Sequence, residues 1–291
     1  MSNHKCLVCN GNGTKLRDFA FFEATQEKLY LLRCDQCHLE FLDPQPSNTW
    51  LGEEYRDYYK RRVGNLKRPK TSYFKKLLSQ THVDFSDKSV VEIGPGEGDC
   101  LVALRSKWKN TRLFAVEANS ESKGFFKELQ CEQYCESIES WLAAGHKEKF
   151  DYVLMFDLIE HLRDPKQTLK TIVSQYLKPG GQIIATFPNV DSASRKLEGR
   201  LWPQYKVEHL FYFSRLAVER IERHTGLNRV KLSPLRKSLP LQYLLNVGTH
   251  FGPTPTRKAI SLLASTLPAK MGRLSLPLYL GEYIWIAEKP A

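Results

Sequence analysis

The chain's most informative stretch reads Ser89-Val90-Val91-Glu92-Ile93-Gly94-Pro95-Gly96-Glu97-Gly98-Asp99-Cys100. Its first half is an apolar run rich in β-branched residues, which is typical of a buried strand. Three glycines at alternate positions then interrupt the run, and Leu101–Leu104 has a helix-compatible pattern. The stretch therefore predicts a strand, a glycine-rich turn and a helix, with glycines that let the backbone approach a ligand closely.

The spacing of these glycines indicates which ligand the turn binds. A dinucleotide fingerprint, G-x-G-x-x-G, needs its third glycine where this chain has Asp99. An acid, Glu92, also precedes the turn, and the next apolar run ends in Glu117, nineteen residues after Gly98. At that distance a carboxylate accepts hydrogen bonds from ribose hydroxyls. Acids around the turn repel a pyrophosphate but suit a ligand with an ammonium and a sulfonium group.

These residues resemble the class I S-adenosylmethionine (SAM)-dependent methyltransferases. Glu92-x-Gly94-x-Gly96-x-Gly98 is similar to the first motif of that family, and Glu117, followed by Ala118, to its ribose-binding acid. The resemblance implies a Rossmann-like, doubly wound sheet of seven strands with SAM bound at this turn. The alternative is a tight turn between a strand and a helix that binds no ligand.

Later segments fit the same α/β fold. Strands expected near 88–93, 113–117, 150–156 and 182–187 alternate with helical segments, which indicates parallel strands with right-handed crossovers. Ligands of such sheets bind beyond the carboxyl ends of the strands. The family resemblance implies further cofactor contacts after the third and fourth strands, at Glu136, Ser137, Ile138, Asp157 and His161.

Two pairs of cysteines stand near the N-terminus. Cys6-x-x-Cys9 and Cys34-x-x-Cys37 are separated by 24 residues. Each pair can supply two thiolates to one tetrahedral ion, so the two pairs complete a closed site. The pattern predicts a zinc-ribbon-like module at residues 1–46 with a structural zinc ion, and a redox-active cysteine pair is the alternative.

The acceptor side of the site is expected in the segment 202–214. SAM carries its own leaving group, so the enzyme mainly aligns the reactants and supplies a general base for a poor nucleophile. Glu208 and His209 before Tyr-Phe-Ser resemble a stretch of zinc-containing deoxysugar C-methyltransferases, which also carry an N-terminal four-cysteine module. That resemblance implies catalytic roles for His209, Glu208 and Tyr205. A packing role for His209 is the alternative.

Two further segments bear on partners. Residues 47–80 form an aromatic and basic linker with a lead-in helix, and nine Lys or Arg residues lie between Arg56 and Lys76. The methyltransferase domain is expected at 81–291, with a helical insertion at 239–280 before the last strand. This insertion is apolar with basic flanks, which suits a lid over a lipid-like acceptor or a contact with a membrane surface. A helical cap packed on the domain is the alternative.

Composition sets the wider expectations. The 291 residues carry a formal net charge of +11, and 42% of them are hydrophobic. No apolar run approaches the ~20 residues of a membrane span, so a cytoplasmic protein is expected, peripheral to a membrane if the insertion contacts one. The favoured acceptor is a small or lipid-linked metabolite, with a sugar or sugar nucleotide first. An RNA methyltransferase and a non-catalytic SAM-binding scaffold are the alternatives, and nucleic acid is the less favoured partner.

Overall fold

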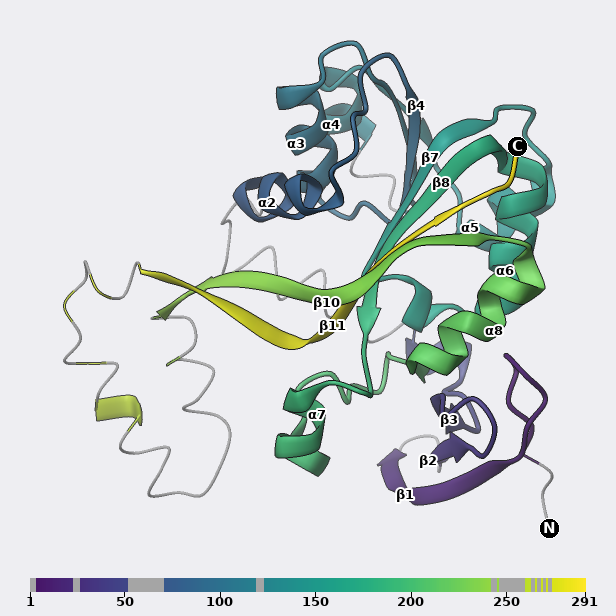
Figure 1. Ribbon diagram of the computed structural model, residues 1–291, viewed down its shortest axis with the longest axis vertical. Coiled ribbons are helices and arrows are strands. Elements are labelled where there is room, and N and C mark those ends of the chain that lie inside the picture. Colours follow the sequence, from purple (N-terminus) through teal and green to yellow (C-terminus); the bar gives the residue numbers. More distant parts are fainter. Residues whose placement is uncertain are drawn as a thin grey trace.

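The computed structural model describes residues 4–22, 27–51, 71–118, 123–241, 245, 260–262, 265, 268, 271 and 274–291. These residues form a seven-stranded sheet and a separate four-stranded sheet. Figure 1 shows helices on both faces of the large sheet and the N-terminal strands beside one of its ends. The linker segment 52–70 and most of the predicted insertion lie outside the described residues.

The large sheet has the strand order β10-β11-β8-β7-β4-β5-β6. Five strands, from β6 to β8 in this order, are parallel, whereas β11 runs antiparallel to β8 and β10 antiparallel to β11. This confirms the predicted seven-stranded, doubly wound fold. The strands are β4 (Ser89–Ile93), β5 (Arg112–Val116), β6 (Cys131–Tyr134), β7 (Phe150–Phe156), β8 (Leu177–Pro188), β10 (Asn228–Pro240) and β11 (Ser275–Glu288).

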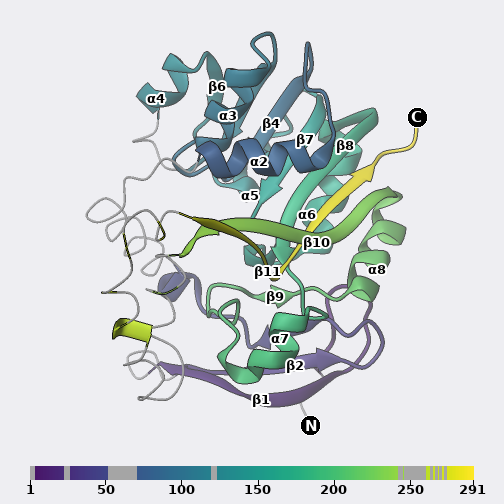
Figure 2. The same cartoon turned by 60° about the vertical axis from the view of Figure 1, so that its left-hand side comes forward.

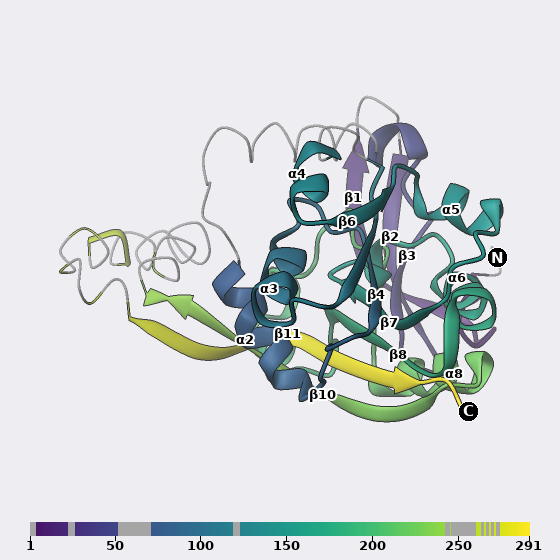
Figure 3. The same cartoon turned by 90° about the horizontal axis from the view of Figure 1, so that it is seen from above.

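Two helical layers cover this sheet, as seen from above in Figure 3. Successive residues of a strand point to opposite faces, so Val90 packs in one core and Val91 in the other. One layer comprises α2 (Thr71–Thr81), α3 (Asp99–Lys107) and α4 (Lys123–Glu128). The other comprises α5 (Ile138–Ala144), α6 (Pro165–Thr171), the π-helix η3 (Ile172–Tyr176) and α8 (Arg215–Thr225). Short helices η2 (Ile159–His161), α7 (Ala193–Glu198) and η4 (Gly199–Leu201) lie in connections.

The bounds of α8 follow from its capping residues, as the sequence predicts. Ser214 accepts a hydrogen bond from the backbone N–H of Ala217, which satisfies a donor of the first turn. Gly226 ends the helix with a φ of 74°, in the left-handed region that favours glycine. The same Ser214 hydroxyl donates a hydrogen bond to the carbonyl group of Cys37, so the helix start is also tied to the cysteine-containing segment.

The small sheet has the order β1-β2-β3-β9 and joins three N-terminal strands to a strand from much later in the chain. It comprises β1 (Gly13–Phe22), β2 (Glu27–Cys34), β3 (Glu40–Asp43) and β9 (Phe211–Tyr212). Figure 2 shows β9 between the N-terminal strands and the large sheet. The sequence did not predict β9, which pairs antiparallel with β3 and begins two residues after His209. One apolar cluster contains both Leu32 of β2 and Phe211 of β9, so the N-terminal strands pack against residues of the later chain.

The antiparallel hairpin of β10 and β11 is longer than predicted. The pairing runs from Asn228 with Glu288 to Pro240 with Ser275. Residues 239–240 and 275–280 are therefore strand, although the sequence places them in the insertion, and the helical residues described between them include 260–262. Within the described part of the chain, no helix combines the length and hydropathy needed to cross a membrane.

Candidate functional site

The turn between β4 and α3 has the backbone that its glycines predict. Gly94, Gly96 and Gly98 have φ values of 69°, 56° and 75°, all in a region that side chains rarely adopt. A Cβ atom on Gly98 would lie 2.7 Å from the rings of Phe125 and Phe126, whereas one on Gly96 would meet nothing within 4 Å. The turn is therefore packed on one side and leaves open space at its middle glycine.

Two of the predicted acids adjoin this turn. Glu117 follows β5 and accepts a hydrogen bond from the backbone N–H of Gly96, with 3.1 Å between nitrogen and Oε2. Glu92 is 2% exposed, and its Oε2 atom has no hydrogen-bond partner among the described residues. Burial, with smaller contributions from Asp99 and Glu117, raises the pKa of Glu92 to about 8. Both acids are therefore buried against the turn, and Glu117 is bonded to its backbone.

The predicted adenine-binding residues follow β6 at the same edge of the sheet. The Ser137 hydroxyl caps α5 by accepting a hydrogen bond from the N–H of Ser140, so the serine has a structural role there. The Glu136 carboxylate lies 3.4 Å from Nε2 of His146. Ile138 is half-buried against the core, and Ala118 is exposed after Glu117. All four residues lie where the fold predicts, beyond the carboxyl ends of β5 and β6.

Asp157 begins a polar cluster beyond the carboxyl end of β7. It has a φ of 50° and accepts a hydrogen bond from the Thr186 hydroxyl, with an O···O distance of 2.8 Å. The Lys237 ammonium lies 3.9 Å from the Asp157 carboxylate and 2.5 Å from that of Glu282. Gln204 also donates to Glu282. Lys237 and Glu282 were not predicted from the sequence, because only the β10–β11 hairpin brings them beside β7.

His161 and His209 meet next to this cluster. Their ring centroids lie 4.8 Å apart with perpendicular planes. His209 is 4% exposed, and its Nδ1 atom lies 2.9 Å from the carbonyl oxygen of Gln204. Burial, together with His161 and Lys206, holds the pKa of His209 well below its usual range. The structure thus brings a predicted catalytic residue and a predicted cofactor residue into contact.

The chain also matches a protein-family model described as a methyltransferase domain, over residues 50–232. This match covers more than half of the chain and contains the turn after β4, Glu117 and the two histidines. The chain belongs to this methyltransferase family. The family resemblance inferred from the glycine spacing is therefore confirmed.

Solved structures show the same fold at low sequence identity. A SAM-dependent methyltransferase from Archaeoglobus fulgidus matches with a TM-score of 0.51 and 17% identity, over 81% of this chain and 99% of that one. A chain of the complex between the Haloferax volcanii Trm112 methyltransferase activator and a methyltransferase matches with a TM-score of 0.53 and 15% identity, over 84% and 97% of the two chains. These similarities show the methyltransferase fold.

A curated relative matches over a shorter segment. (S)-coclaurine N-methyltransferase from Thalictrum flavum subsp. glaucum is 29% identical over 96 residues, which are 32% of this chain and 27% of the relative. The match thus spans about a quarter of that enzyme's length. It adds a second similarity to methyltransferases without extending to a whole enzyme.

Tyr205, a predicted catalytic residue, contacts the N-terminal sheet. Its hydroxyl donates to the Glu40 carboxylate of the N-terminal sheet, at 2.5 Å, and accepts from the Arg195 guanidinium at 3.0 Å. Arg195 also pairs with Glu40, with 2.7 Å between nitrogen and oxygen. Tyr205 therefore fastens the N-terminal sheet to the domain. Glu208 is half-buried beside His209, and its backbone carbonyl accepts a hydrogen bond from His161.

We expect Tyr205→Phe to destabilise the protein by about 1–3 kcal/mol, because it leaves a charged Glu40 buried with one partner fewer. The midpoint of urea unfolding measures this loss, and Tyr279→Phe, at an exposed tyrosine, is the control. Loss of turnover by Tyr205→Phe with unchanged stability would support the predicted catalytic role instead.

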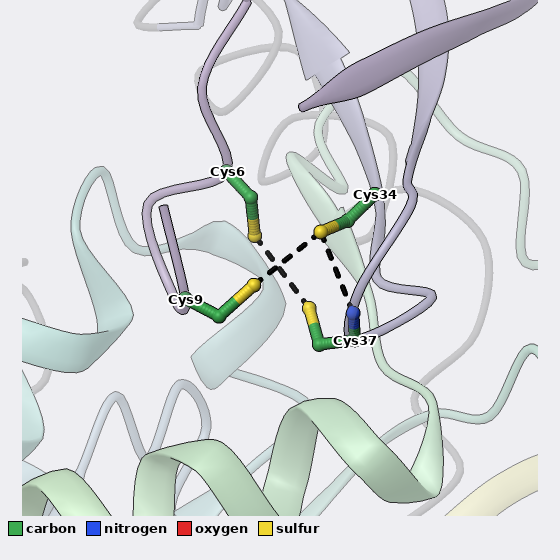
Figure 4. A group of neighbouring side chains, drawn as sticks. All are labelled: Cys6, Cys9, Cys34 and Cys37. Carbon is green, nitrogen blue, oxygen red and sulfur yellow. Dashed lines mark hydrogen bonds between the residues drawn. The ribbon is translucent and has the colours of Figure 1, made fainter. Parts of the chain in front are cut away.

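The four cysteines of the predicted metal site converge from two loops, as Figure 4 shows. Sγ of Cys6 lies 3.6 Å from Sγ of Cys37, and Sγ of Cys9 lies 3.3 Å from that of Cys34. These separations approach the ~3.8 Å edge of a tetrahedron with 2.3 Å metal–sulfur bonds. The backbone N–H groups of Gln36 and Cys37 point at Sγ of Cys34. None of the four forms a disulfide, so the donor set fits one tetrahedral ion.

Proposed function

We propose that this protein transfers a methyl group from SAM to a small-molecule acceptor. The observation that carries the proposal is the turn after β4, where three left-handed glycines adjoin the buried acids Glu92 and Glu117. In this proposal Glu117 accepts hydrogen bonds from the ribose hydroxyls, and Glu92 faces the cationic amino-acid end. When bound, SAM supplies the methyl group on a sulfonium leaving group, so the chain's own residues align the acceptor with it.

The proposed acceptor is a polyhydroxylated metabolite, with a sugar or sugar nucleotide first. Its support is the dense polar surface beside the cofactor edge, where Asp157, Lys237, Glu282 and Gln204 offer both donors and acceptors. These groups already pair with one another, and their remaining hydrogen-bonding capacity suits the several hydroxyl groups of a sugar better than an apolar acceptor. The choice of a sugar rests on the resemblance of the Glu208-His209 pair and the four-cysteine module to deoxysugar C-methyltransferases.

A structural zinc ion at Cys6, Cys9, Cys34 and Cys37 completes the proposal. Its support is the closed set of four thiol ligands, which leaves no coordination position for a substrate. The segment that carries these cysteines pairs through β3 with β9, and β9 begins two residues after His209. In this proposal zinc affects the acceptor side of the site indirectly, because it stabilises the segment that positions the loop with the acceptor-side residues.

We expect His209→Ala to lower turnover at least 100-fold while SAM affinity stays within about twofold, because His209 belongs to the acceptor half of the site. Methyl transfer from labelled SAM to a panel of sugar nucleotides, lipid-linked sugars, amines and RNA measures the turnover and identifies the acceptor class. The control is His224→Ala, at an exposed histidine of α8. Normal turnover by His209→Ala would refute this role. Transfer to RNA alone, with a steep salt dependence, would favour the nucleic-acid alternative.

Peripheral membrane contact through the insertion remains part of the proposal. Leu262 and Leu274 are 67% and 57% exposed, which supports an apolar contact surface. We expect the full chain to co-sediment with vesicles containing anionic lipid and to dissociate when Leu262 and Leu274 are both replaced by serine. Absence of co-sedimentation by the wild-type chain would leave the helical-cap interpretation of residues 239–280.

A further inference from the structure

Three potential metal ligands meet beyond the carboxyl end of β7, apart from the four cysteines. Glu160, His161 and His209 each provide one donor atom, and these atoms all lie within 4.8 Å of one another. Glu160 and His161 belong to the short helix η2, whereas His209 comes from the loop before β9. The backbone N–H of Leu210 donates to the carbonyl of Glu160 at 2.8 Å, which fixes the two segments to each other. The fold thus assembles two imidazoles and one carboxylate from distant parts of the chain.

The Glu160 side chain gives an independent indication of a ligand. It is 1% exposed, and its Oε2 atom has no hydrogen-bond partner in the described part of the chain. A buried carboxylate without a partner costs several kcal/mol unless it is protonated or binds a cation. A positive ion between Glu160 and the two rings would satisfy the carboxylate.

Backbone carbonyl groups orient both imidazoles. Nδ1 of His209 lies 2.9 Å from the carbonyl oxygen of Gln204, and His161 donates to the carbonyl of Glu208. Histidine ligands of metal ions usually make such a second contact, because it fixes the tautomer and leaves the lone pair of the other ring nitrogen for the metal. The loop that contains Gln204 and Glu208 therefore supplies one ligand and the positioning contacts for both rings.

The charges around the cluster are compatible with a cation. Besides burial, the negative charges of Asp157 and Glu282 raise the pKa of Glu160. Three carboxyl groups therefore lie in one region. Two ammonium groups oppose them: Lys237, which is paired with Glu282 at 2.5 Å, and the exposed Lys206. A divalent ion between Glu160 and the two rings would offset the mutual repulsion of these carboxylates.

We propose that Glu160, His161 and His209 bind a divalent transition-metal ion that holds an oxygen atom of the methyl acceptor. This proposal rests on the proposed function, because it assigns the cluster to the acceptor. Two imidazoles and one carboxylate bind Zn²⁺, Mn²⁺ or Fe²⁺ and leave coordination positions open. An acceptor hydroxyl bound there loses its proton to water more readily. Its oxygen then bonds to the methyl carbon, and the carbon–sulfur bond breaks with its electron pair returning to sulfur. The site therefore selects hydroxyl acceptors.

Binding of Mn²⁺ tests the site without any turnover, because Mn²⁺ prefers nitrogen and oxygen ligands and does not report on the four thiolates. We expect the full chain to bind one Mn²⁺ ion, with spin-echo modulation from histidine nitrogen in its electron paramagnetic resonance spectrum. Glu160→Gln and His161→Ala should each weaken this binding at least tenfold. His224→Ala should bind as the wild type does. Thermal unfolding of each variant shows whether the fold is retained.

Two results would overturn the metal site. One is a wild-type chain that binds neither Mn²⁺ nor any Zn²⁺ beyond the single equivalent held by the cysteines. The other is unchanged Mn²⁺ binding by Glu160→Gln and His161→Ala. A chain that binds SAM and transfers methyl groups but binds no second metal refutes this inference alone. A chain that binds Mn²⁺ but not SAM refutes the proposed function and leaves the metal site standing.

Discussion

Replacing Glu117 with alanine is expected to weaken SAM binding by more than 100-fold. The side chain is buried at the end of β5 and is tied to the glycine turn by its contact with the Gly96 N–H. In the proposed complex the Glu117 carboxylate accepts hydrogen bonds from two ribose hydroxyls. Charge-assisted hydrogen bonds contribute about 1.5–3 kcal/mol each. A loss of about 3 kcal/mol corresponds to roughly 150-fold in affinity. Isothermal titration calorimetry with SAM measures it.

Two further variants give this prediction its controls. Glu117→Gln keeps the shape and an acceptor for the Gly96 N–H but lacks the charge, so its SAM affinity should fall between wild type and Glu117→Ala. Glu128→Gln removes an exposed acid of α4 and should leave SAM affinity unchanged. If Glu117→Ala bound SAM as tightly as the control, the ribose contact would have to be reassigned.

Replacing Cys34 with serine is expected to release the structural zinc ion and to lower the melting temperature by more than about 10 °C. Structural zinc contributes folding free energy directly, about 10–16 kcal/mol in isolated zinc-finger peptides. Loss of even about 5 kcal/mol lowers the melting temperature of a domain this large by roughly 10–20 °C. Turnover should fall as well, because β3 of the same segment pairs with β9 next to His209.

Elemental analysis and thermal unfolding of the purified variant measure both effects. Cys135→Ser is the matched control, because Cys135 is a free thiol outside the four-cysteine cluster. It should keep one equivalent of zinc and the wild-type melting temperature. Retention of a full equivalent of zinc by Cys34→Ser would refute the four-cysteine assignment.

Local patterns predicted the large sheet and its cofactor edge from the sequence. The alternation of apolar strands and helices indicates a doubly wound sheet, and the caps Ser214 and Gly226 give the bounds of α8. The turn at Gly94–Gly98 could be predicted because its backbone needs glycine at each left-handed position. The position of Glu117 follows from the length of one strand and one helix.

Long-range contacts could not be predicted in the same way. Strand β9 is two residues long and pairs with β3 across about 170 positions of the chain, so no local periodicity reveals it. Local patterns also do not reveal the hydrogen bond from Tyr205 to Glu40 in the N-terminal sheet. Nor do they reveal the ion pair between Lys237 of the last hairpin and Asp157. His161 and His209 could be predicted as site residues from the sequence, but only the fold shows that they lie close to each other and to Glu160.

The most direct test of the central claim is calorimetric titration of the purified full chain with SAM and, separately, with S-adenosylhomocysteine. We expect each compound to bind once per chain and Glu117→Ala to weaken both, because the glycine turn and its acids form the proposed cofactor site. Absence of binding of either compound by a folded, zinc-loaded chain would refute SAM-dependent methyl transfer by this protein.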